Sequence, residues 1–278
     1  MPHLLVVVVR THNQNKITVS EDKYMEYINI RFKIPQESKS YQSDSLFVVE
    51  TIEEIIQSAI NMGNNKIILN TNLKLGLPME NINKIAGPII EAWAYETFCY
   101  LRDDLDNIYK LVNVEPLPRL DKADILLQFK KNKSSITANV DVKATAVDIE
   151  NSGKGPNITS FSRIRSAYIE DPDFMFIILS VKHKVYSERN RETKLMDGIM
   201  EIVNYNAYDL KFLSDNDINY NPALGTGQIQ IKDIHYVEYE YRTTWEFCQL
   251  LDRKYLNSSR RSFDDWHREA VKNKWIKE

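Results

Sequence analysis

Apolar residues recur along the chain with the spacing of strands and of helices in alternation. Strand-like runs are predicted at 27–34, 66–70, 123–129, 136–142, 174–181 and 229–241. The run FMFIILSV at 174–181 is apolar almost throughout, as in a central strand buried on both faces. Helical spacing covers 49–62, 88–105, 160–170 and two segments that begin near Thr243 and Ser262. Alternation of this kind predicts an α/β or α+β fold with a central mixed β-sheet flanked by helices.

Residues that start or stop helices mark several boundaries. Gly63 closes the helix at 49–62, and the Asp171-Pro172 pair ends the helix at 160–170. Pro88 suits the first turn of the helix that follows it. The first ten residues, MPHLLVVVVR, are too short for the apolar part of a signal peptide and are interpreted as a buried strand.

Domain boundaries are only weakly marked, since the chain contains eight glycines and no linker rich in Pro, Gly or Ser. We expect an N-terminal extension or small lobe over residues 1–80 and a main domain over residues 81–278 that includes the C-terminal helices.

Composition excludes several classes of protein. Apolar residues make up 43% and charged residues 27% of the chain, and no apolar run approaches the length of a membrane helix. The two cysteines lie far apart and form no CxxC pair, which argues against a disulfide framework or a thiolate zinc site. We therefore expect a cytoplasmic protein without a membrane partner. The net charge of −3 gives no global indication of nucleic-acid binding, although the polar segment 182–194, interpreted as a loop, and the segment 253–277 are locally basic.

Two aspartates at the ends of strand-like runs are the main candidates for chemistry. A hairpin turn at 130–134 would bring the strand of Asp124 beside the strand of Asp141, with both carboxylates at neighbouring strand ends. Carboxylates that close repel each other unless a cation lies between them, and such hard oxygen ligands suit Mg²⁺. Lys143 shares a strand face with Asp141. It could orient or deprotonate an attacking water, or stabilise charge that develops on a phosphodiester during metal-assisted hydrolysis.

The residues alone support two explanations of Asp124, Asp141 and Lys143 equally, because an acid two places before a lysine occurs repeatedly in this chain. One is a nuclease site, and the other is a hairpin whose ends carry solvated charges. Only Asp141 and Lys143 follow a strand-like run and have a second aspartate upstream within its own strand context, ADILL.

A family resemblance favours the first explanation. Ala123-Asp124 followed by Asp141-Val142-Lys143 resembles the PD-(D/E)xK motif of nucleases, with alanine in place of the usual proline. Together with PNITS at 156–160 and YRTTWE at 241–246, the chain is similar to type II restriction endonucleases of the EcoRV-like branch, and in particular to HincII. The likeness is closest over residues 87–168, weaker in the C-terminal third and absent from the first eighty residues. In an enzyme of this kind we expect residues 1–80 to be an additional lobe that clamps DNA.

The resemblance implies a restriction-endonuclease-like core and specific roles for individual residues. Asp124 and Asp141 would be metal ligands, Lys143 the catalytic lysine and Glu91 an accessory acid. The loop that enters the DNA groove would contain Lys154, Gly155, Pro156 and Asn157, with Asn157 contacting base edges. Thr145 lies one place later than the threonine of the family, which leaves its role open. Lys182 and Lys184 would contact phosphates.

The activity implied is Mg²⁺-dependent, sequence-specific cleavage of double-stranded DNA by a homodimer, leaving 5′-phosphate, 3′-hydroxyl and blunt ends. Two alternatives stay open. One is a structure-specific repair or recombination nuclease on the same core, and the other is a DNA-binding protein without catalysis.

Overall fold

The computed structural model describes residues 21–75, 79–103, 106–118 and 121–277. Its main sheet has the strand order β1-β7-β6-β4-β3-β2. These strands are β1 (Lys66–Leu69), β2 (Leu111–Pro116), β3 (Ile125–Lys131), β4 (Ser134–Ala146), β6 (Phe176–Arg189) and β7 (Met196–Asp209). Only β4 and β6 pair in parallel, so the sheet is mixed as predicted. A second sheet, ordered β5-β9-β8, contains β5 (Asn157–Ser160), β8 (Ile218–Asn221) and β9 (Gln228–Ile231).

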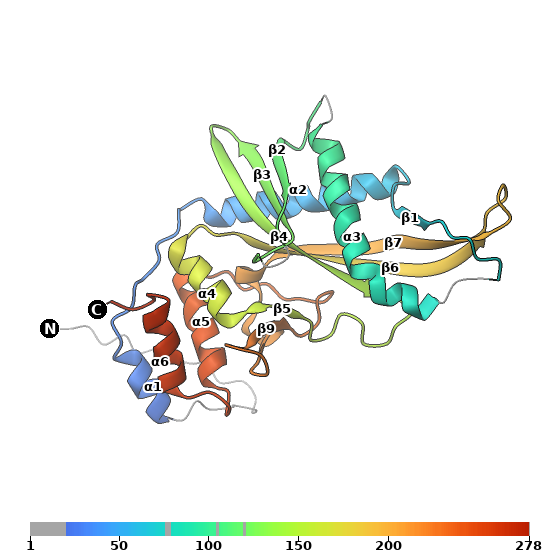
Figure 1. Ribbon diagram of the computed structural model, residues 1–278. Coiled ribbons are helices and arrows are strands. Elements are labelled where there is room, and N and C mark those ends of the chain that lie inside the picture. The colour runs from blue at the N-terminus through green and yellow to red at the C-terminus, as the bar shows by residue number, and fades with distance from the viewer. Residues whose placement is uncertain (1–20, 76–78, 104–105, 119–120, 278) are drawn as a thin grey trace.

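Helices cover both faces of the main sheet. On one face α2 (Tyr41–Asn61) and α3 (Met79–Arg102) pack against the strands (Figure 1). The opposite face meets α4 (Phe161–Glu170), α5 (Thr244–Leu256) and the second sheet, while α1 (Glu21–Ile28) and α6 (Phe263–Lys272) lie at the outer end. Alternate residues of β6 enter different cores, Ile177 on the α2/α3 side and Ile178 on the α4/α5 side. This strand is buried on both faces, as its continuous apolar run predicted.

Several predicted elements are confirmed. The helix at 160–170 is α4, the strand at 66–70 is β1, and the hairpin of 123–129 with 136–142 is β3–β4. Gly63 follows α2 with a φ of +77°, a conformation that glycine adopts without strain. The last two helices begin where expected, because the side chains of Thr243 and Ser262 each form a capping box with the third residue of the helix.

The strand predicted at 27–34 is wrong. Helix α1 ends at Ile28, and of the residues that follow only Phe32 forms an isolated bridge, to Ile276. The ring of Phe32 packs against Trp245 and Trp266, with centroids 5.0 and 5.9 Å apart. The alternation of apolar residues therefore reflects an extended segment packed on the C-terminal helices rather than a strand of a sheet.

Three further boundaries differ from the prediction. Pro88 lies inside α3, which begins at Met79 rather than at the proline. The basic segment 182–194 was expected to be a loop, but its residues as far as Arg189 belong to β6. They form a strand because β7, which was not predicted, pairs with β6 as far as Arg189. The predicted strand 229–241 ends at Ile231.

The first twenty residues lie outside the described ranges, and with them the strand predicted at 1–10. The described residues 41–69 contribute α2 and β1 to the main sheet and its core. A boundary at residue 80 and a DNA-clamping role for residues 1–80 stay predictions. Within the described ranges, no helix is both long and apolar enough to span a membrane.

Candidate active site

The β3–β4 hairpin brings the two aspartates together at its open end. Ile125 is paired with Val140 in the antiparallel register, and Asp124 and Asp141 each lie one residue beyond this pair. The N–H of Asp124 donates to the carbonyl of Val140 at 3.0 Å, so Asp124 and Ile125 both lie against Val140. The charge of Asp124 contributes to the raised pKa of Asp141, as expected for two carboxylates that lie close together.

Asp124 is held in place by its own carboxylate. Its Oδ2 accepts a hydrogen bond from the backbone N–H of Val142 at 2.7 Å, between the other two candidate residues. This bond fixes the side chain over β4 and commits one carboxylate oxygen.

Asp141 is a buried acid without a full set of partners. The residue is 5% exposed. Its Oδ2 forms an ion pair with Lys143 Nζ at 2.6 Å, yet no described donor lies at a proper hydrogen-bond angle to this oxygen. Burial raises the pKa of Asp141 to about 7, with Lys143 opposing the shift and the charges of Asp124 and Glu91 adding to it. The site therefore lacks positive charge for its carboxylates.

Glu91 approaches the same site from α3. Burial, followed by the charge of Asp124, raises the pKa of Glu91, while Lys143 lowers it. These mutual influences show that Glu91, Asp124, Asp141 and Lys143 share one electrostatic environment. The structure thus brings together the four candidate catalytic residues, from one helix and one hairpin.

The donor set fits Mg²⁺ better than a metal that needs a complete protein cage. Within the described residues, no group of three or more His, Cys, Asp or Glu side chains could hold a metal ion. Two neighbouring carboxylates, one with a buried oxygen that lacks a hydrogen bond, match an ion usually bound through one or two carboxylates with water and phosphate. Asp124 and Asp141 are the residues that would hold it, and Glu91 lies outside this pair.

The predicted DNA-contacting loop lies beside the second sheet. Lys154 and Asn157 are exposed. The N–H of Gly155 donates to the carbonyls of Ile231 and Lys232, at 3.1 Å each. The loop is therefore fastened to the strand β9 and the residues after it, while the two polar side chains stay accessible.

Thr145 is buried rather than exposed, and its partner is a residue that the sequence did not indicate. Its hydroxyl bonds His235 Nε2 at 2.5 Å, and the other ring nitrogen bonds the Ser180 hydroxyl at 2.9 Å. Burial and the charge of Lys182 lower the pKa of His235 to about 4, so the ring is neutral at pH 7. A Cβ on Gly153 would lie 3.0 Å from this ring. His235 thus joins β4, β6 and the predicted DNA-contacting loop.

The basic residues differ in whether an acidic side chain already pairs with their charge. Lys182 lies over the ring of Tyr236, at 5.3 Å, whereas Lys184 pairs with Glu201 at 3.1 Å. In the 253–277 segment, Arg253 and Lys254 both pair with Asp215. Lys182 is therefore better placed for a phosphate contact than Lys184, although both roles stay predictions.

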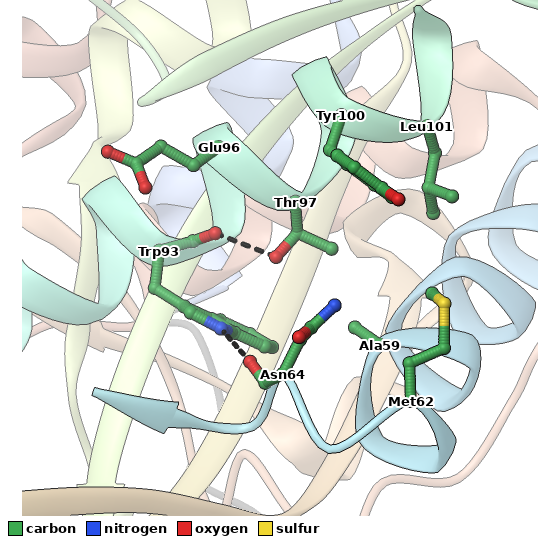
Figure 2. Close-up of a pocket in the computed structure, with 8 residues that line it drawn as sticks. All are labelled: Ala59, Met62, Asn64, Trp93, Glu96, Thr97, Tyr100 and Leu101. Atoms are coloured by element: carbon green, nitrogen blue, oxygen red, sulfur yellow. Dashed lines mark hydrogen bonds between the residues drawn. The ribbon is translucent and has the colours of Figure 1, made fainter. Parts of the chain in front are cut away.

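A surface pocket elsewhere does not contain these residues. Figure 2 shows it between the end of α2 and α3, where the Trp93 indole N–H donates to the carbonyl of Asn64 at 2.8 Å. None of the ten candidate residues lines it. The acidic cluster therefore lies outside this concavity.

Comparison with known proteins identifies relatives over nearly the whole chain. The family model described as type II restriction endonuclease HpaI matches residues 28–274. The type II restriction enzyme HpaI of Haemophilus parainfluenzae is 61% identical over 254 residues, which cover 91% of this chain and all of that enzyme. The match includes the first eighty residues in part, where the motifs gave no likeness. The narrower resemblance to HincII stays a prediction.

Proposed function

The chain belongs to the HpaI family of type II restriction endonucleases, and from this premise we propose that it hydrolyses both strands of a short DNA site with Mg²⁺ at Asp124 and Asp141. The observation that carries the proposal is the pair of neighbouring carboxylates at the open end of the hairpin, with Lys143 Nζ 2.6 Å from Asp141. Water attacks phosphorus and the 3′ oxygen leaves, which gives 5′-phosphate and 3′-hydroxyl ends, and blunt ends follow from the resemblance to the EcoRV-like branch.

Each residue has a role that its surroundings support. Asp124 and Asp141 bind the cation, whose charge offsets the burial that raises the pKa of Asp141. When bound, Mg²⁺ would polarise the scissile phosphate and favour deprotonation of water. The Lys143 side chain is 23% exposed, so its ammonium group reaches from Asp141 to the solvent side, where a phosphate oxygen or the attacking water would lie.

Glu91 is proposed to tune the site rather than to bind the cation. Its charge raises the pKa of Asp141 less than the charge of Asp124 does. Glu91→Gln should therefore change the concentration of Mg²⁺ needed for half-maximal rate more than the maximal rate.

A homodimer is proposed because cleavage of two strands requires two active sites. A two-fold symmetric pair would match a palindromic or pseudo-palindromic site. Sedimentation of the protein with and without a duplex would measure the assembly directly. The compartment proposed is the cytoplasm, since the substrate is cellular or invading DNA.

The experiment that tests the proposal is incubation of the purified protein with phage genomic DNA, with Mg²⁺ or with EDTA. Discrete fragments only with Mg²⁺ are expected, and sequencing their ends gives the site and the cut position. Lys143→Ala should keep DNA binding in the absence of Mg²⁺ and lose cleavage, whereas Lys184→Ala, whose charge is already paired with Glu201, should cut nearly as the unaltered protein does. Normal cleavage by Lys143→Ala would refute the site assignment, and a smear of fragments would refute sequence specificity.

A further inference from the structure

The second sheet presents a face made of amide and hydroxyl side chains. In its register Asn157 is paired with Gln230, which is paired with Asn219. The next row joins Ser160, Gln228 and Asn221. The opposite face is apolar, with Ile218, Ile229 and Ile231 fully buried. Strands normally contain little asparagine, and a solvated face usually carries charges, so six uncharged polar residues call for an explanation.

The second sheet is tied to β4, the strand that contains Asp141 and Lys143. His235, four residues after β9, bonds Thr145 of β4, and Gly155 in the loop between β4 and β5 donates to the carbonyl of Ile231 in β9. Asn157 is exposed and Gln230 is half-buried, so both can be reached from solvent. Charged groups give affinity without sequence information, whereas amides distinguish bases.

Hydrogen bonds fix which atoms of the amide pair remain available. Gln230 Nε2 donates to the carbonyl of Gly155 at 2.9 Å and to Asn157 Oδ1 at 3.0 Å. A carbonyl can only accept, so the nitrogen of Gln230 must face it, and Asn157 must then present its oxygen to that nitrogen. The atoms without a hydrogen-bond partner among the described residues are the donor Nδ2 of Asn157 and the acceptor Oε1 of Gln230.

We propose that Gln230 is a second specificity-determining residue, which with Asn157 forms one donor–acceptor pair that recognises adenine in the major groove. Only adenine presents an acceptor, N7, beside a donor, the 6-amino group, on its own major-groove edge. Guanine offers two acceptors there, while cytosine and thymine each offer one polar group. Asn157 Nδ2 would donate to N7, and Gln230 Oε1 would accept from the 6-amino group. The inference rests on the proposed nuclease function.

Base analogues test the two contacts separately in the duplex that carries the mapped cleavage site. Replacing an adenine by 7-deazaadenine removes the acceptor N7, and replacing it by purine removes the 6-amino group. At one adenine of each half-site, both analogues should slow single-turnover cleavage by the unaltered protein about 5- to 150-fold, the range for a good bidentate contact. At every other adenine of the site, at most one of the two analogues should slow cleavage.

Substitutions then assign each contact to its residue. Gln230→Ala should cleave the natural duplex about 5- to 150-fold more slowly and lose its response to purine at that adenine. Asn157→Ala should lose its response to 7-deazaadenine and keep its response to purine. Gln128→Ala is the matched control, because Gln128 also bonds across strands, to Thr137 at 3.3 Å, but lies on the main sheet. It should behave as the unaltered protein does.

Every outcome decides the matter. A mapped site without adenine, no adenine that responds to both analogues, or a Gln230→Ala protein that still responds fully to purine would overturn this inference while leaving the nuclease function intact. The analogue result with the unaltered protein holds even if a variant fails to fold. Absence of Mg²⁺-dependent cleavage by the unaltered protein would instead refute the proposed function, and this inference with it.

Discussion

Replacing Asp141 with asparagine is expected to make the metal-free protein more stable while abolishing cleavage. Asparagine keeps the shape of the side chain and removes the negative charge. The folded state holds that charge at a cost, because the side chain is buried and the charge of Asp124 lies nearby. The native protein thus binds a proton at Asp141 more tightly than the unfolded chain does.

The size and sign of the change in the free energy of unfolding follow from the shift in the pKa of Asp141. The change from the ordinary value of 3.8 to about 7 corresponds, at 1.36 kcal/mol per pH unit, to about 4 kcal/mol of lost stability at pH 8. Because the folded-state pKa is the higher one, the loss is absent below pH 4, grows as the pH rises and is complete above pH 7. The gain in the free energy of unfolding on Asp141→Asn should therefore be about 2 to 3 kcal/mol larger at pH 8 than at pH 5.

Urea unfolding in EDTA at pH 5 and pH 8 measures this difference. Asp217→Asn is the matched control, since Asp217 is 8% exposed but accepts hydrogen bonds from the Ser214 hydroxyl and the Glu238 N–H. The control should lose stability at pH 8. Mg²⁺ at 100 times its dissociation constant should add about 2.7 kcal/mol to the unaltered protein and little to Asp141→Asn. The reasoning would be refuted if the gain in stability of Asp141→Asn did not depend on pH, or if this variant were less stable than the unaltered protein at pH 8.

Three other substitutions test separate parts of the structure. Asp252→Ala should cost about 3 to 5 kcal/mol in urea unfolding, because the fully buried Arg165 would lose its carboxylate partner; a loss below about 1 kcal/mol would contradict this. Gly227→Ala should lower the melting temperature more than Gly225→Ala, since only at Gly227 would the new Cβ collide with the hydroxyl and ring of Tyr220, although both glycines have positive φ; equal effects would show that the Tyr220 side chain moves aside freely. The unaltered protein should lose stability as the pH falls from 6.5 to 4, because the unfolded chain protonates His235 more readily than the folded protein does. His235→Gln should make this loss about 1 to 2 kcal/mol smaller, since His235 is partly exposed to solvent; an unchanged pH dependence of unfolding would exclude His235 as the group responsible.

Short-range patterns in the sequence predicted the elements that local chemistry determines. The turn and alternating residues of the β3–β4 hairpin predicted that Asp124 and Asp141 lie at neighbouring strand ends, and the caps Thr243 and Ser262 predicted the starts of α5 and α6. The roles of the site residues stay predictions.

Long-range packing determines what the sequence did not indicate. The segment at 27–34 alternates because it packs on aromatic rings more than two hundred positions away in the chain. His235 and Gln230 acquire candidate roles only because the second sheet folds back onto the loop after β4. A lone histidine or a glutamine in a polar stretch carries no local signal of such contacts.

The far end of the β3–β4 hairpin controls the distance between the two carboxylates. Its tight turn spans Asn132, which has a φ of +57°, and Lys133, and it lies about 25 Å from Asp124 at the usual rise per residue. One inserted residue at this turn, if taken up by sliding the strands, would shift Asp124 by one residue along β4 and change its distance from Asp141. The turn is exposed and touches no predicted DNA contact, yet its length would decide whether a cation can bridge the pair. Inactive members of this family could therefore arise by indels at the hairpin tip while retaining every catalytic residue.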